Sequence, residues 1–150
     1  MGYKYGVWIV LPINGVKTHI PHATIACNMT REDAFILYEE FIELNGKNIR
    51  CVIDLSHYDI LGPDYYESCD SDENGWCWAY NVDIEATLPS NIVNYDFPKS
   101  HHISMQYEYE KEDLNPEKKE IICSLVGSLE VVNILSDVPN DWHVITQQGR

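Results

Sequence analysis

Two short motifs with the same order of residue types stand about half a chain apart. His22 is followed two residues later by Thr24, and His102 is followed two residues later by Ser104. In an extended strand, residues i and i+2 point to the same face, so each imidazole has a hydroxyl beside it. If the two strands lie next to each other, two imidazoles and two hydroxyls converge on one face.

This set of groups suits cleavage of a phosphodiester. A neutral imidazole takes a proton from the attacking water or ribose hydroxyl, and a protonated one gives a proton to the leaving oxygen. Histidine fits both roles because its ordinary pKa is about 6.5. Thr24 and Ser104 would donate hydrogen bonds to the non-bridging oxygens. The mechanism needs no metal and no cofactor. The alternative is that both histidines are polar residues at strand edges and that the hydroxyl residues only favour strands.

Two further histidines flank the motifs. His19 and His101 have Pro21 and Ile103 two residues on, where the motifs have a hydroxyl. Alternation aims His101 away from the face of His102. Together the four histidines could in principle ligate zinc, but adjacent strand residues point to opposite faces, so His101 and His102 do not readily share one ion. We therefore expect no metal site.

The elements that must position the motifs follow from the hydrophobic periodicity. Thr30, with Asp33 three residues on, is a variant of the capping box and predicts a helix that begins there. Ala34, Leu37 and Phe41 form its apolar stripe, and Gly46 is a natural residue just past its end. Strands are expected at residues 5–11, 22–28, 48–61, 76–88, 102–109, 130–135 and 142–146, and helical spacing is found at residues 116–127.

The order of these elements predicts an α+β fold. A chain of 150 residues with no dividing linker is one domain, residues 1–150. Each half contains a strand that opens with His-x-Thr or His-x-Ser, then an acidic turn, a helix and a further strand. That order suggests a duplicated lobe.

The charge of the chain excludes one class of partner. The formal net charge is −14, with only ten Lys and Arg. A long nucleic acid normally requires a basic stripe, so we expect none as a partner. A small phosphorylated ligand remains compatible, because a few donors in a cleft outweigh distant charges. Five scattered cysteines and the lack of any long apolar run predict a cytoplasmic protein that does not enter the membrane.

The motifs His22–Ala23–Thr24–Ile25 and His102–Ile103–Ser104–Met105 resemble the two His-x-[Thr/Ser]-x-hydrophobic motifs of the 2H phosphoesterase superfamily, the LigT-like group. The similar order of elements covers nearly the whole chain. The resemblance implies a two-lobed fold with antiparallel sheets, a pseudo-twofold axis and helices packed outside a central cleft. It also implies metal-independent phosphodiesterase activity, with His22, Thr24, His102 and Ser104 as the catalytic residues.

The chain is compact and lacks the basic surface of the RNA-processing members. In this it is more similar to compact viral members that cleave 2′–5′ oligoadenylates or cyclic di- and oligonucleotide signals. The resemblance therefore implies a small nucleotide substrate and a viral or phage anti-defence role, in the host cytoplasm. The alternatives are a 2′,3′-cyclic nucleotide or RNA-end phosphodiesterase, a non-catalytic nucleotide-binding module and an acidic protein-interaction module.

Several rings and one lysine are candidates for substrate binding. A base stacked on an aromatic side chain gains about 1–3 kcal/mol regardless of sequence. Lys99, three residues before His102, could offset phosphate charge. Each ring, taken alone, is more often part of a core. The substrate-binding candidates are Trp8, Tyr65, Tyr66, Trp76, Lys99 and Trp142, and Trp78 is a further stacking candidate.

Overall fold

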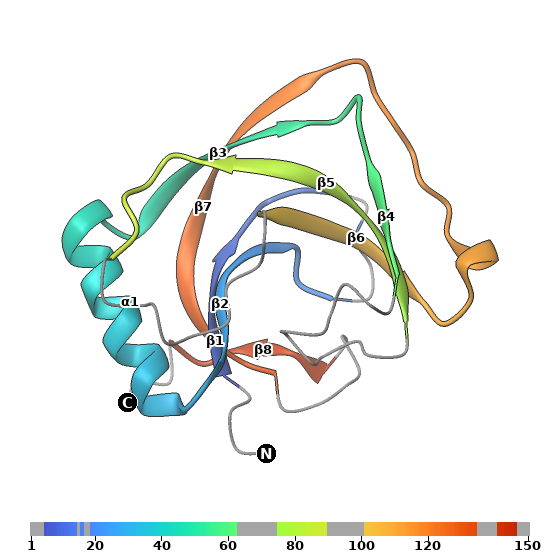
Figure 1. Cartoon of the computed structure of the whole chain (residues 1–150). Coiled ribbons are helices and arrows are strands. Elements are labelled where there is room, and N and C mark those ends of the chain that lie inside the picture. Colours follow the sequence, from blue (N-terminus) through green and yellow to red (C-terminus); the bar gives the residue numbers. More distant parts are fainter. Residues whose placement is uncertain are drawn as a thin grey trace.

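A computed structural model of the chain describes residues 5–14, 16, 19–62, 75–89, 101–134 and 141–146. Within these ranges one α-helix and an antiparallel sheet of eight strands make a mixed α+β fold (Figure 1), as the sequence predicts. The elements are β1 (Tyr5–Val10), β2 (His22–Met29), α1 (Arg31–Asn45), β3 (Asn48–Asp54), β4 (Asp59–Leu61), β5 (Trp76–Ile84), β6 (His102–Glu108), a 3₁₀ turn (Lys111–Asp113), β7 (Ile122–Asn133) and β8 (His143–Val144).

Six of the strands close into a ring in the order β1-β2-β6-β5-β3-β7, because β7 also pairs with β1. Ser128 marks the closure, since it pairs with Asn48 of β3 and with Val10 of β1. β4 pairs with β5, and β8 pairs with β7. Figure 1 shows the strands curling around an interior, with α1 at one end. Closure gives these six strands a hydrogen-bonding neighbour on both sides.

Helix α1 forms where its local signals predict it. The Thr30 hydroxyl accepts a hydrogen bond from the Asp33 amide at 3.1 Å, and Gly46 ends the helix at φ +81°. An N-terminal cap such as that of Thr30 stabilises a helix by about 1 kcal/mol. The helix buries Phe35, Phe41 and their apolar neighbours against the interior of the sheet.

Apolar side chains cover both faces of β1 and β2. Val7 and Ile9 of β1 point into the larger core, which also holds the buried side of α1. The residue between them, Trp8, points outward into a second cluster that is completed by Cys27, Val132, Ile134 and Trp142. The sheet therefore separates an inner face from an outer one, and His22 lies on the outer face with Trp8.

The prediction of helical spacing at residues 116–127 is wrong. That stretch runs into β7, whose first half pairs residue by residue with β3 from Ile122 to Ser128. Ile121, Ile122 and Val126 are β-branched, which favours a strand once a partner is present. The strand expected separately at residues 130–135 is the end of β7. In the described second half of the chain no α-helix is found, so the second helix of a duplicated lobe is missing there.

The remaining boundaries differ little from the prediction. Residues 48–61 divide into β3 and β4 around a turn that begins at Leu55, and the strand expected at residues 76–88 ends at Ile84. The described helix is neither long nor apolar enough to cross a membrane.

Candidate functional site

The two motif strands are neighbours. β2 runs antiparallel to β6, and the pair is aligned at Ala23 opposite Ile103. This register sets His22 opposite Ser104 and Thr24 opposite His102. Ala23 and Ile103 are fully buried on the inner face. Because side chains alternate along a strand, the four motif side chains share the outer face.

The imidazole of His22 is held on two sides. Its ring stacks on Trp8 with 3.4 Å between ring centroids and 5° between planes. Its Nδ1 lies 2.6 Å from the carbonyl oxygen of Ile20. A carbonyl only accepts, so we assign the proton to Nδ1, which leaves a lone pair on Nε2. The side chain is 7% exposed.

Burial sets the protonation state of His22. Desolvation is the main cause that lowers its pKa to about 3, and repulsion from protonated His19 and His102 lowers it further, while the carbonyl of Ile20 opposes both. At neutral pH the ring is therefore uncharged and can only accept a proton at Nε2.

His19 is the functional candidate that the sequence undervalues. Its Nε2 lies 2.8 Å from the carbonyl oxygen of Ser104 and donates to it, which links the segment before the first motif to the second motif. Its ring lies 6.2 Å from that of His22 and 4.9 Å from that of Tyr107, and burial lowers its pKa. The lack of a hydroxyl two residues on gave no hint of this contact, since it depends on how β2 and β6 pair.

The predicted stacking residues divide between the two faces. Trp8 and Trp142 lie at the histidines, with rings 5.9 Å apart, but they are 2% and 5% exposed and pack against the protein. Trp76 lies on the inner face, where Lys111 covers its ring at 5.3 Å, so it is not brought to the histidines. Tyr65, Tyr66 and Lys99 lie outside the described residues.

The hydroxyls differ in their surroundings. Ser104 is buried, and its Oγ lies 3.6 Å from Sγ of Cys77 on β5, whereas Thr24 is half-buried.

His101 stands just before β6. Its backbone carbonyl accepts a hydrogen bond from the Val82 amide, and burial lowers the pKa of its ring.

The cysteines are of two kinds. Among the cysteines that the structure describes, Cys51, Cys77 and Cys123 form no disulfide, whereas Cys27 is disulfide-bonded. Disulfides are unusual in the cytosol, so the compartment stays a prediction.

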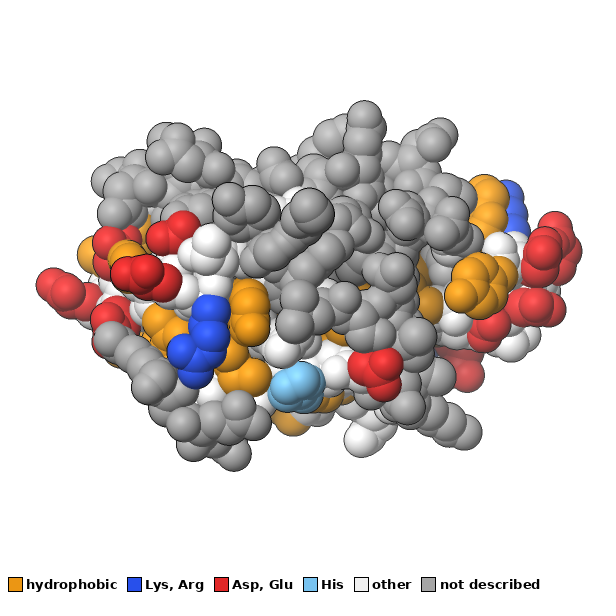
Figure 2. Space-filling view, turned by 90° about the horizontal axis from the view of Figure 1, so that it is seen from below, with side chains coloured by type: hydrophobic (Ala, Val, Ile, Leu, Met, Phe, Trp, Pro, Cys, Tyr) orange, Lys and Arg blue, Asp and Glu red, His pale blue; other side chains and the backbone are white. Residues whose placement is uncertain are grey.

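No metal cluster is found in the part of the chain that the structure describes: no three His, Cys, Asp or Glu side chains gather there as ligands. On the face seen in Figure 2, most of the described acidic side chains lie toward the two ends.

Comparison with protein-family models, with curated proteins and with solved structures found no match to this chain.

Proposed function

We propose that this protein is a metal-independent phosphodiesterase for a small nucleotide, in which His22 and His102 transfer the protons. The observation that carries the proposal is the pairing of Ala23 with Ile103, because it aligns the two motifs on one face. In this register His22 and His102 are diagonal neighbours, and diagonal positions of an antiparallel pair are about 7–8 Å apart. One phosphate group spans that distance.

The surroundings of the two histidines support different roles. His22 is the base, because it is neutral and its Nε2 has a lone pair. A pKa near 3 is low for a base, but an anionic phosphate beside the ring favours the charged form and raises the pKa when substrate binds. His102 is more exposed than His22 and acts as the acid. Thr24 and Ser104 donate to the non-bridging oxygens.

The class of substrate follows from charge. With a net charge of −14, the protein repels long polyanions, so a compact nucleotide with one or a few phosphodiesters is the fitting substrate. Cyclic di- or oligonucleotide signals and 2′–5′ oligoadenylates belong to this class, and their removal would serve a virus or phage in the cytoplasm of its host.

We also propose the two-lobed 2H architecture: neighbouring motif strands are what a cleft between two lobes requires.

A second candidate is a non-catalytic nucleotide-binding module. The burial of His22 under Trp8 favours it, since a base must reach the proton that it removes. The two candidates differ in product formation.

The test is incubation of the protein in EDTA with cyclic dinucleotides, 2′–5′ oligoadenylates and 2′,3′-cyclic nucleotides, followed by chromatography. We expect cleavage of at least one of the first two classes. His22→Ala and His102→Ala should each lower kcat by about 10²–10⁴-fold, the usual contribution of a positioned acid or base. His143→Ala is the matched control, because His143 is exposed on β8.

Three results would contradict the proposal. Activity that EDTA abolishes would replace the two-histidine mechanism with a metal mechanism. Tight binding without product would favour the non-catalytic module. Cleavage of 2′,3′-cyclic ends alone would move the substrate to RNA ends.

A further inference from the structure

A cavity of about 680 Å³ lies on the inner face of the sheet, behind the histidines. Met105 lines it, whereas the preceding residue, Ser104, faces outward. This volume is typical of small-molecule sites, and the mouth of a closed ring of strands is a common place for one.

Aromatic rings form one wall of the cavity. Trp78 and Tyr80 pack edge to face, with 5.2 Å between centroids and 84° between planes. Their polar tips are both occupied: Trp78 Nε1 donates to Gln106 at 3.1 Å, and the Tyr80 hydroxyl donates to the carbonyl of Glu117 at 2.6 Å. What these rings offer a ligand is therefore apolar surface.

Gln106 completes the polar network of that wall. Its amide oxygen also accepts from the Asn115 backbone at 2.8 Å, and its amide nitrogen donates to the Glu108 carboxylate at 2.8 Å and to the carbonyl of Asp113 at 3.0 Å. The wall is fixed before any ligand arrives, and a preorganised wall lowers the entropy cost of binding.

Another part of the lining comes from a single extended stretch, whose first residues are hydrogen-bonded to Gln106 and Tyr80. Every second residue from 115 to 125 lines the cavity, in the alternation of a strand: Asn115, Glu117, Lys119, Ile121, Cys123 and Leu125. The first three are polar and exposed, whereas Cys123 and Leu125 of β7 are half-buried. The cavity therefore passes from a charged rim to an apolar floor, which suits an amphipathic ligand.

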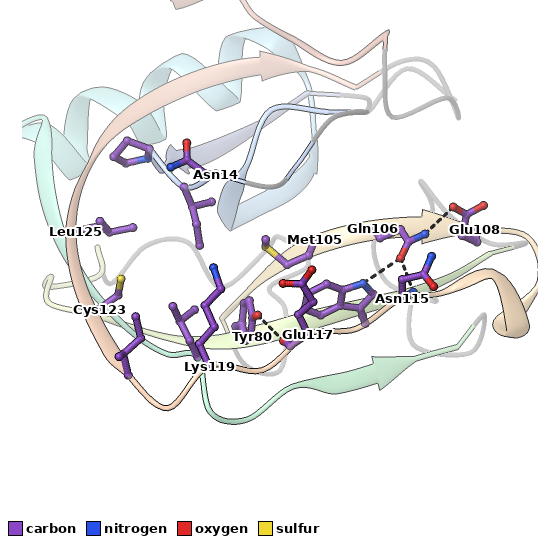
Figure 3. Close-up of a pocket in the computed structure, with 15 residues that line it drawn as sticks. Asn14, Tyr80, Met105, Gln106, Glu108, Asn115, Glu117, Lys119, Cys123 and Leu125 are labelled. Carbon is purple, nitrogen blue, oxygen red and sulfur yellow. Dashed lines mark hydrogen bonds between the residues drawn. The ribbon is translucent and has the colours of Figure 1, made fainter.

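The rim carries two opposite charges. Figure 3 shows the ammonium of Lys119 and the carboxylate of Glu117 both turned into the cavity. Burial raises the pKa of Tyr80, and the nearby Glu117 carboxylate raises it further, which agrees with an inward carboxylate. No ion pair joins these two side chains within the described ranges, although they stand only two residues apart.

We propose that this cavity binds an amphipathic small molecule whose head carries both a cationic and an anionic group. The anionic group pairs with Lys119, the cationic group pairs with Glu117, and the apolar body lies between Trp78 and Leu125. A ligand with a single charge would pair with only one of the two rim residues. It would lie close to the other residue, whose charge has the same sign as its own, and would leave that residue unpaired. This site is independent of the proposed phosphodiesterase activity, so either can fail alone.

The test uses ¹³C-methyl methionine NMR with three decyl compounds below their micelle-forming concentrations. They are the zwitterion N-decyl-N,N-dimethylglycine, the anion decanoate and the cation decyltrimethylammonium. Met105 lines the cavity, while Met29 is fully buried in the core and serves as the internal reference. We expect the Met105 signal to shift and the Met29 signal to stay. The zwitterion should bind about two- to fivefold more tightly than either ion, the range that exposed ion pairs give.

Matched variants locate the charges. Lys119→Met should reduce the affinity for the zwitterion to that for the cation, and Glu117→Gln should reduce it to that for decanoate. Lys118→Met, between them but outside the lining, should change neither. The Met29 signal reports whether each variant is folded. An unshifted Met105 signal, equal affinity for the three compounds or an equal effect of Lys118→Met would overturn the proposal, and the wild-type comparison decides even if a variant does not fold.

Discussion

Successive residues of β6 point to opposite faces of the sheet, and the two faces give their side chains different environments. On the outer face, His22 is 7% exposed and its neighbours Trp8 and Trp142 are buried. On the inner face, the cavity opens at a rim where Glu117 and Lys119 are exposed to solvent. The outer face encloses its polar groups, and the inner face leaves its charges in water.

This difference decides what each face is able to do. Desolvation holds His22 neutral, and the carbonyl of Ile20 fixes its tautomer, as a proton-transfer site requires. The rim charges of Glu117 and Lys119 are exposed to solvent, so a ligand can reach both, and salt weakens that attraction. Under the two proposals, one strand thus serves proton transfer on its outer side and ligand recognition on its inner side.

Removal of the ring beneath His22 should have the largest effect on this comparison. Trp8→Ala leaves a void under the imidazole, and substitutions of this kind lower the free energy of unfolding by about 3–5 kcal/mol. Urea denaturation measures the loss. Trp8→Phe, which keeps a ring in the stack, should lose less. If Trp8→Ala and Trp8→Phe unfold at the same urea concentration, the stack on His22 does not stabilise the outer face.

Acid should destabilise the outer face next. The pKa of His22 is about 3 in the folded chain and about 6.5 when unfolded, so below pH 6.5 the unfolded chain binds more protons. The free energy of unfolding should fall by up to about 1.4 kcal/mol per pH unit from pH 6.5 toward pH 3. His19 and His101, whose pKa values are also lowered, add to the fall.

Urea denaturation at several pH values checks this slope. His22→Asn should make it shallower, whereas His143→Asn, a change at an exposed histidine, should leave it unaltered. Equal slopes in the wild type and in His22→Asn would mean that His22 is not buried in solution.

Local signals in the sequence predicted the parts of the fold that depend on neighbouring residues. Thr30 and Gly46 mark the ends of α1 because caps act within one turn, and alternation located β2 and β6 to within one residue. The stretch at residues 116–127 failed because its apolar spacing fits both a helix and a strand. Pairing with β3, distant in the chain, decides between them.

For the candidate site, the sequence predicted only the face to which the motif side chains point. The spacing of each motif sets its hydroxyl on the face of its histidine, whatever the partner strand. The stack of Trp8 on His22 depends on the register of β1 against β2, which pairs Trp8 with Thr24 and Val10 with His22 and which no local pattern encodes. The bond from His19 to Ser104 depends on the pairing of β2 with β6, and the cavity behind β6 likewise depends on contacts between distant parts of the chain.

The smallest of these effects should come from Gly127, which lies where the ring closes and so connects both faces. A Cβ there would lie 2.6 Å from the carbonyl oxygen of Val10 and 2.5 Å from the side chain of Ile9. Backbone cannot give way as a flexible side chain does, so Gly127→Ala should lower the free energy of unfolding by about 1–3 kcal/mol. Gly75→Ala is the control, since its Cβ would make only an ordinary contact at 3.5 Å. Urea denaturation measures the stability of both variants, and the slope of the unfolding free energy against urea concentration should stay unchanged. Because Ile9 adjoins Trp8 and Gly127 is two residues from Leu125, a shift of β1 should weaken cleavage and cavity binding together. Equal stability of Gly127→Ala and wild type would mean that β1 and β7 do not pair in this register and that the two faces are not joined by a closed ring.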